Sequence, residues 1–150
     1  LAPHKCGIAY SFAAVMFSQP LAWFEATGLS VKNTNCLIDI IRVYRHHQDK
    51  ILSGLVLPIG EEPDGTKFTG FQSILSEKSG YLLILREMND DDTYSYLLWG
   101  DVFKAGYRKI FIEKLVGEGQ NRFIDINSNG KVKFQLIKPF SYGLYRYELK

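Results

Sequence analysis

The chain has 150 residues, of which 46% are hydrophobic and 23% are charged, which is the composition of an ordinary globular domain. Its net charge of +2 comes from 18 basic and 16 acidic residues scattered along the sequence, whereas a nucleic-acid-binding domain carries a clustered basic stripe, so nucleic acid is excluded as a partner. The ten Phe, nine Tyr and two Trp suit either densely packed sheets or a surface on which flat ligands such as sugars stack.

The N-terminal third is predicted to be helical and begins with a segment that is apolar on every side. Its run 8–17 is interrupted by Tyr10 and Ser11 and is too short to cross a bilayer, so no membrane span is predicted. No basic region precedes it and no cleavage site follows it, so it is not a signal peptide, and the compartment stays open. The apolar segment continues to Phe24, with Pro20 interrupting it, and predicts burial on all faces.

A more regular helix is predicted after this segment. Its apolar face repeats at positions i, i+3, i+4 and i+7, through Leu37, Ile40, Ile41, Tyr44 and His47. Asn33, Thr34 or Asn35 is expected to cap its N-terminus. The two cysteines, Cys6 and Cys36, lie outside the strand-rich region that would most need a disulfide, so buried thiols are predicted.

From Ile51 onward the hydrophobic period changes to two, and turn residues separate short apolar runs. Turns are predicted at Pro63-Asp64-Gly65, at Ser79-Gly80, and at Asn129-Gly130, the strongest hairpin signal in the chain. Strands are predicted at 52–59, 67–76, 80–88, 93–99, 107–116, 121–127, 131–137 and 142–149. The pattern predicts an antiparallel β-sandwich of about eight strands, preceded by one or two α-helices.

The change of period places a boundary near Ser53-Gly54. Residues 1–52 form a helical segment, and residues 53–150 form the sandwich domain. Two helices of this kind do not enclose the all-round apolar segment by themselves. Either they pack against the sandwich, or their partners lie upstream of Leu1.

Two patterns suggest a metal site, and neither is complete. Asp125, Asn127 and Asn129 match the first half of a calcium loop, but its twelfth position is Leu136, which offers no carboxylate. A hairpin turn is predicted there instead.

The histidines give no better metal site. His46 and His47, beside Asp49, are adjacent on a helix and point in different directions, and His4 with Cys6 lacks a third ligand. No metal and no cofactor are predicted.

No catalytic residue is predicted either. Glycoside hydrolysis needs two carboxyl groups held at a fixed separation, one of them with a raised pKa. The carboxylates at 61, 62 and 64 flank a turn, and those at 90–92 crowd a hairpin tip, so both groups are expected to be solvated. Ser11, Ser18 and Ser53 lack the G-x-S-x-G signature, and neither cysteine has a catalytic motif around it.

Aromatic residues crowd the last predicted strand, at Phe140, Tyr142, Tyr145 and Tyr147. Because side chains alternate along a strand, these rings straddle both faces, and only one face is expected to be core. Exposed tyrosines on the other face would stack a sugar. Structural packing and a carbohydrate platform both remain open, with Tyr142, Tyr145 and Tyr147 as the candidate carbohydrate-binding residues.

The run IDIIRVYRHHQDKILSG, residues 38–54, resembles the end of the last barrel helix in α-galactosidase-like glycoside hydrolases of clan D, especially family 36. In that family this helix closes a (β/α)8 barrel and leads straight into a C-terminal β-sandwich. FSQPLAWFE, residues 17–25, then resembles the end of the barrel. GFQS at 70–73 and GYLLILRE at 80–87 resemble the first strands of the sandwich.

The resemblance implies a retaining glycosidase parent, of which residues 1–52 end the barrel and residues 53–150 form an accessory sandwich. The family's catalytic aspartates stand on earlier barrel strands, and none is matched here. The implied partner is the catalytic barrel of the same parent chain. Two alternatives stay open: a carbohydrate-binding module, suggested by the aromatic content, and a protein-interaction domain that docks through its apolar helices.

Overall fold

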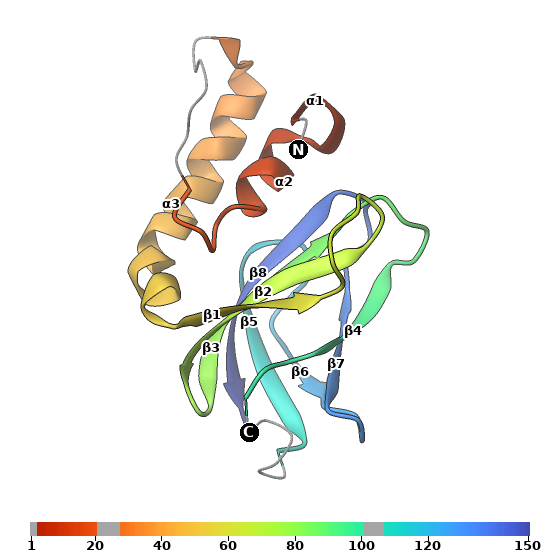
Figure 1. Ribbon diagram of the computed structural model, residues 1–150. Helices are drawn as coiled ribbons and strands as arrows, with labels where there is room; N and C mark the ends of the chain where they lie inside the picture. The colour runs from red at the N-terminus through yellow and green to blue at the C-terminus, as the bar shows by residue number, and fades with distance from the viewer. Residues whose placement is uncertain (1–2, 21–27, 101–106) are drawn as a thin grey trace.

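The computed structural model describes residues 3–20, 28–100 and 107–150. Within them the chain forms three helices followed by eight strands, so the predicted antiparallel β-sandwich with preceding helices is confirmed (Figure 1). The helices are α1 (Pro3–Cys6), α2 (Ile8–Ala13) and α3 (Val31–Ser53). The strands are β1 (Leu55–Gly60), β2 (Phe68–Ser76), β3 (Ser79–Arg86), β4 (Thr93–Leu97), β5 (Lys109–Gly117), β6 (Arg122–Asp125), β7 (Lys131–Gln135) and β8 (Ser141–Leu149).

The strands form two sheets of very different size. The large sheet has the order β1-β2-β3-β8-β5-β6, and the small sheet pairs β4 with β7. All neighbouring strands are antiparallel. Among the described residues a single backbone bridge, between Ile126 and Val132, links the sheets at one corner. Side chains must therefore hold the sheets together elsewhere.

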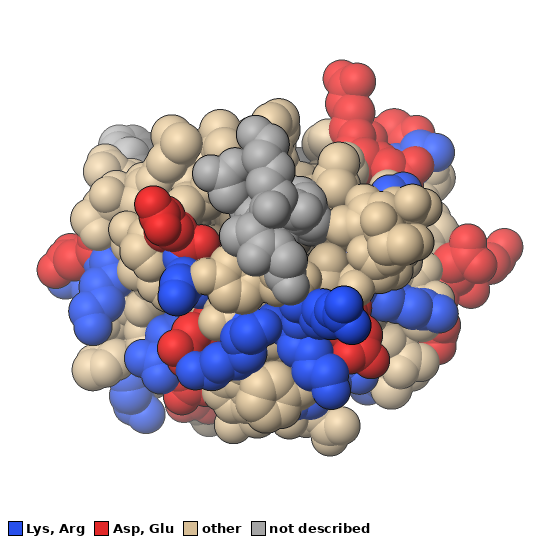
Figure 2. Space-filling view, turned by 90° about the horizontal axis from the view of Figure 1, so that it is seen from below, with Lys and Arg blue, Asp and Glu red and all other residues tan. Residues whose placement is uncertain are grey.

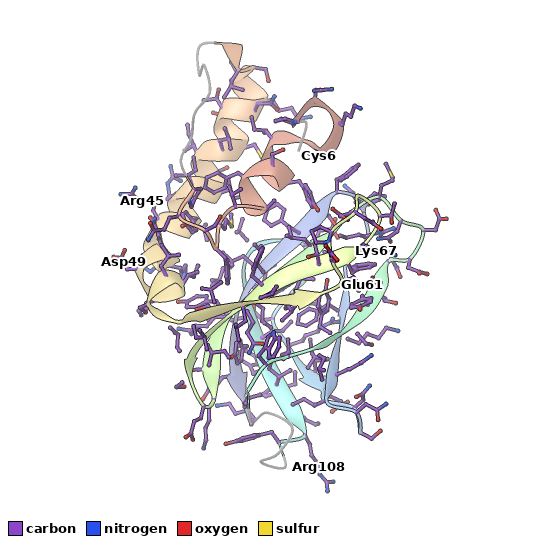
Figure 3. The ribbon with its side chains drawn as sticks, viewed as in Figure 1. Cys6, Arg45, Asp49, Glu61, Lys67 and Arg108 are labelled. Carbon is purple, nitrogen blue, oxygen red and sulfur yellow. The ribbon has the colours of Figure 1, made fainter. Side chains whose placement is uncertain are left out.

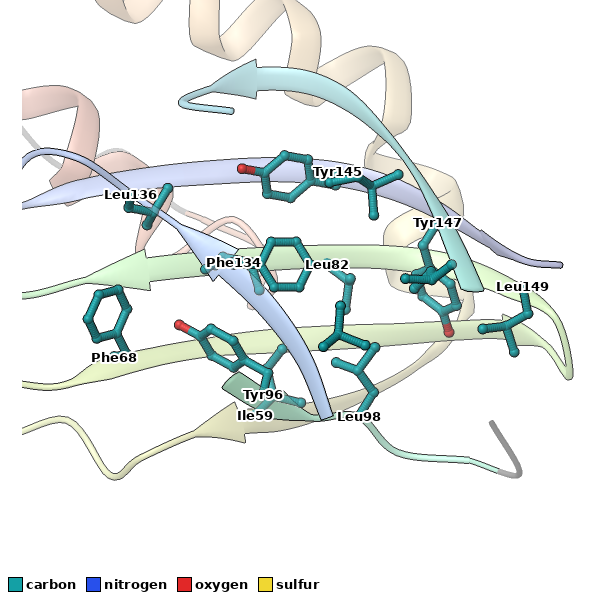
Figure 4. Close-up of a cluster of buried hydrophobic side chains, with 14 residues drawn as sticks. Ile59, Phe68, Leu82, Tyr96, Leu98, Phe134, Leu136, Tyr145, Tyr147 and Leu149 are labelled. Carbon is teal, nitrogen blue, oxygen red and sulfur yellow. The ribbon is translucent and has the colours of Figure 1, made fainter. Parts of the chain in front are cut away.

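The first core fills the space between the two sheets. Val132 and Phe134 of β7 point inward and are buried, while Lys131 and Lys133, which alternate with them, are exposed, as the period of two requires. Tyr96 from β4 meets Phe134 edge-to-face, with ring centroids 5.8 Å apart (Figure 4). The large sheet contributes its inner face to the same cluster.

The second core lies on the outer face of the large sheet, beneath the helices. Leu37, Ile40 and Tyr44 of α3 are buried there together with Tyr81 and Leu83 of β3. Strand β3 is therefore covered on both faces, which explains its continuous apolar sequence. Of the two arrangements left open by the sequence, the structure shows the first: the helices pack against the sandwich.

The prediction that the apolar N-terminal segment is buried on all faces was wrong for its described part. Tyr10, Ala13, Met16 and Phe17 lie in the second core, whereas Val15 is 38% exposed, because only one side of this segment meets α3 and the sheet. The remainder of that segment, at 21–24, lies outside the described residues.

Helix α3 begins earlier than predicted. Its N-cap is Ser30, whose hydroxyl accepts a hydrogen bond from the Asn33 backbone N–H at 3.2 Å, so the prediction of Asn33, Thr34 or Asn35 was wrong. The first turn of α3 is exposed and carries no apolar stripe, so the hydrophobic periodicity did not show where the helix begins.

The prediction of two buried thiols is wrong for Cys36, which lies on the exposed face of this helix, whereas Cys6 is buried.

The joint between α3 and β1 is expected to be sensitive to packing. Ile51 has no exposed surface, and its carbonyl accepts a hydrogen bond from the Ser73 hydroxyl at 2.6 Å. We expect Ile51→Val to lower the free energy of unfolding by about 1 kcal/mol, because one buried methylene is lost. Urea unfolding followed by circular dichroism measures this change. The matched variant Ile38→Val, on the same helix at 47% exposure, should change stability by less than about 0.5 kcal/mol, and equal losses would contradict the packing described here.

Candidate functional site

The predicted carbohydrate platform does not have the exposed rings it requires. Tyr145 and Tyr147 are 1% and 2% exposed and lie in the core between the sheets. The expectation that only one face of the last strand is core was wrong, because the helices cover part of the other face, where Leu144 is buried. Neither of these two rings presents a surface on which a sugar could stack.

Both buried tyrosines use their hydroxyl groups within the fold. The Tyr145 hydroxyl donates to the Glu118 carbonyl at 2.8 Å, and burial raises the pKa of Tyr145 to about 12. The Tyr147 hydroxyl accepts a hydrogen bond from Gln72 Nε2 at 3.0 Å, and burial raises its pKa as well. These side chains therefore act as structural links.

Tyr142 is the third predicted residue, and it lies apart from the other two. Its ring is half-buried against the helical side of the large sheet, and burial raises the pKa of its hydroxyl. It lines an open groove of about 370 Å³ together with Cys6, Cys36 and Phe140. The structure thus does not bring the three predicted tyrosines onto one surface.

The carboxylates between β1 and β2 are exposed, as expected. Lys67 Nζ lies 3.9 Å from carboxylate oxygens of both Glu61 and Asp64 (Figure 3). The Thr66 hydroxyl and backbone N–H donate to the Asp64 carboxylate, and these hydrogen bonds lower its pKa. A glycosidase acid needs the opposite shift.

A carboxylate that the sequence did not single out organises this turn. Glu87 is 7% exposed, and its Oε2 accepts backbone hydrogen bonds from Asp64, Gly65 and Lys67 at 3.2, 2.7 and 3.0 Å. Hydrogen bonds from three backbone N–H groups to this one oxygen compensate for the burial of the Glu87 carboxylate. Glu87 therefore closes the turn.

The calcium-like segment is a turn, as predicted. Asn127 Oδ1 accepts from the backbone N–H groups of Asn129 and Lys131 at 3.0 and 2.8 Å. This oxygen is therefore used inside the turn. Across residues 3–20, 28–100 and 107–150, no three His, Cys, Asp or Glu side chains group closely enough to hold a metal ion.

A polar cavity of about 550 Å³ lies where the C-terminal half of α3 meets the large sheet. At its edge His47 Nδ1 is 3.1 Å from the Tyr81 hydroxyl, and burial lowers the pKa of His47. Arg146 Nη2, inside the cavity, lies 2.7 Å from Glu113 Oε2. The His47–Tyr81 contact therefore joins α3 to β3, whereas the Arg146–Glu113 pair joins β8 to β5 within the sheet.

Trp99, which the sequence argument did not single out, combines exposure with a fixed position. Its side chain is 51% exposed, yet the indole Nε1–H donates to the Pro58 carbonyl at 2.6 Å. Its backbone N–H donates to Gln72 Oε1 at 2.7 Å, and its carbonyl accepts from Gln72 Nε2 at 3.1 Å. Gln72 has no exposed surface. The buried Gln72 amide therefore fixes the backbone of Trp99, while the indole ring of Trp99 stays half-exposed.

The alternation of side-chain direction along the predicted strand 93–99 could have identified Trp99 as exposed. Tyr96 and Leu98 are buried, so Ser95, Leu97 and Trp99 fall on the opposite side. A cavity of about 300 Å³ adjoins the ring. Its lining consists of Pro58, Ile59, Gly60, Tyr94, Ser95, Leu97, Leu98, Trp99 and Lys131.

No family model matches the chain, and no curated protein matches it. None of the described helices is both long enough and apolar enough to cross a membrane.

Figure 2 shows Lys and Arg gathered in a band across the face seen from below, with Asp and Glu beside them. These basic residues are scattered along the sequence and come together only in the fold, so the exclusion of nucleic acid stays a prediction.

Proposed function

We propose that this chain is the C-terminal region of an α-galactosidase-like glycoside hydrolase. In this proposal residues 1–52 end a catalytic (β/α)8 barrel, and residues 53–150 form the accessory sandwich that stabilises it. The chain itself carries out no hydrolysis. Its partner is the catalytic barrel of the same parent polypeptide.

The observation that carries the proposal is the direct junction between α3 and β1. Only Gly54 separates the two elements. A Cβ on Gly54 would collide with the Ser73 side chain and approach the Ile74 carbonyl oxygen to 2.8 Å. This close approach, with the hydrogen bond to the Ile51 carbonyl, makes the helix continuous with the sandwich. A junction of this kind suits a sandwich that supports the last helix of a barrel.

The outward face of α3 supports the same proposal. Val31 and Ile38 are 78% and 47% exposed, on the helix whose other side is buried against the sheet. Exposed apolar side chains on a helix that already has a packed face are suited to burial against a second body. Arg45 and Asp49 also point away from the sheet, where they would meet the barrel or its edge (Figure 3).

The test uses the complete reading frame that encodes this chain. We expect it to encode a barrel of roughly 250 residues upstream, with aspartates at strand ends. The full product should hydrolyse 4-nitrophenyl α-D-galactopyranoside, whereas residues 1–150 alone should be inert. Turnover by the isolated chain at enzyme-like rates, or a reading frame without a barrel, would overturn the proposal.

A paired variant tests the interface directly. Val31→Asp combined with Ile38→Asp should leave the isolated chain as stable as the wild type, since both positions are exposed there. In the parent enzyme the same changes should lower the melting temperature and the activity. Phe123→Asp, at 58% exposure on the edge strand β6, serves as the control. It removes the ring contact with Phe111 and should therefore change the stability of the isolated chain and of the parent enzyme to the same extent.

A further inference from the structure

The half-exposed ring of Trp99 needs an explanation that packing does not supply. A Trp side chain stabilises a fold mainly by burying its large apolar surface, and here about half of that surface remains in water. The three hydrogen bonds to Pro58 and Gln72 nevertheless hold both its backbone and its indole N–H. The result is a rigid exposed ring face.

Rigidity of this kind favours ligand binding. A ring that is already held in place loses little conformational entropy when a ligand stacks on it. The hydrogen-bond chain reaches the core, because Gln72 Nε2 also donates to the buried Tyr147 hydroxyl at 3.0 Å. Tyr147 therefore contributes to this surface from beneath, although its own ring is inaccessible.

The adjoining cavity indicates what kind of ligand would fit. Its volume of about 300 Å³ is at the lower end of the range of small-molecule sites. Beside the indole it carries a few polar side chains, Tyr94, Ser95 and Lys131, and none of the described residues that line it is a carboxylate. Lys131 is directly opposite Leu97 in the pairing of β4 with β7, so the ammonium group belongs to the rim of the same surface.

A pyranose ring matches these features. One of its faces presents C–H groups that stack on an aromatic ring, and its edge presents hydroxyl groups that pair with hydroxyl and ammonium donors. A purely apolar ligand would leave Ser95 and Lys131 without partners. A polyanion would require more cations than Lys131, the one cation among the described residues that line this cavity.

We propose that Trp99 and the cavity beside it bind one hexopyranose unit of a neutral glycan. This site is separate from the three tyrosines predicted from the sequence. The inference does not depend on the parentage proposed above, because a free-standing module would bind in the same way.

The experiment probes the chain of residues 1–150 with an array of neutral α- and β-hexopyranosides, followed by calorimetry on the glycans retained. We expect binding with a Kd of about 1 mM or tighter. Trp99→Ala should weaken it at least about tenfold, and Trp99→Phe should weaken it less because a stacking face remains. Phe123→Ala removes an aromatic ring of similar exposure from β6, none of whose residues lines the cavity, and should leave affinity unchanged.

A second variant distinguishes loss of binding from loss of folding. Trp99→Ala removes a hydrogen bond to Pro58, so its fold is checked by circular dichroism and urea unfolding. Lys131→Ala changes only an exposed side chain on the cavity rim and should also weaken binding severalfold. Absence of binding to every glycan on the array, or binding that Trp99→Ala and Lys131→Ala leave intact, would overturn the inference. Neither result bears on whether a barrel precedes the chain.

Discussion

Replacing Arg86 with Met is expected to lower the free energy of unfolding by about 4 kcal/mol. The guanidinium group is 3% exposed and lies at the end of β3. It donates to the carbonyls of Leu136, Ile137 and Asn89 at 2.7, 2.8 and 2.7 Å. Met fills the space but leaves these acceptors without a charged donor, so their desolvation is no longer compensated.

The size of this effect follows from where Arg86 acts. Leu136 and Ile137 follow β7 of the small sheet, whereas Arg86 ends a central strand of the large sheet. The described strands of the two sheets share one backbone bridge, at the corner formed by Ile126 and Val132. Arg86 therefore supplies hydrogen bonds between the sheets that the backbone does not.

Chemical denaturation followed by circular dichroism measures the Arg86 effect. Arg146→Met is the matched control, because it removes the same atoms from a side chain on β8 that is 57% exposed and paired with Glu113. An exposed ion pair contributes less than about 1 kcal/mol. Equal losses in the two variants would show that Arg86 does not join the sheets.

Gly70→Ala is expected to destabilise the protein by about 3 kcal/mol, the upper end of the range for overpacked cores. Gly70 lies in β2 opposite Ile84 of β3. A Cβ at this position would collide with the Leu83 carbonyl oxygen and lie close to the backbone of Leu83 and Ile84. Because all these atoms belong to the backbone of a central strand, no side-chain rotation relieves the contact.

Gly28→Ala is the control for this prediction. Gly28 is exposed, and a Cβ there meets no atom within 4 Å. Its melting temperature should equal that of the wild type or exceed it slightly, since Ala restricts the unfolded chain. A loss of less than about 1 kcal/mol in Gly70→Ala would mean that β2 and β3 can separate locally without disturbing the sheet.

The eight strands could be predicted because their signals are local. Turn residues at Pro63-Asp64-Gly65 and Asn129-Gly130 stop one strand and begin the next, whatever the strands later pair with. The helix cap was missed because the apolar stripe of α3 begins only at Leu37, whereas Ser30 caps an exposed first turn. A periodic pattern reports the packed part of a helix and gives no information on an exposed end.

The candidate site was harder to predict, because exposure depends on what covers a face. Alternation correctly placed Tyr145 and Tyr147 on one side of β8 but did not say that the small sheet covers that side. Trp99 belongs to the uncovered side of its segment, and Gln72, which fixes the backbone of Trp99, is 27 residues away in the sequence. Nothing in the local pattern connects the two.

The sequence by itself determined the fold class, the order of the elements and the turns at Pro63-Asp64-Gly65 and Asn129-Gly130, since each depends on residues that are near neighbours in the chain. The turn predicted at Ser79-Gly80 was wrong, because these two residues begin β3 and pair with β8, and the turn falls at Glu77 and Lys78. Tertiary structure alone decided that the helices cover the outer face of the large sheet, that Arg86 and Glu87 are buried and satisfied, and that Trp99 remains exposed. These features depend on contacts between distant segments. A pattern of period two specifies that a strand has two faces, but only packing decides which of them meets water.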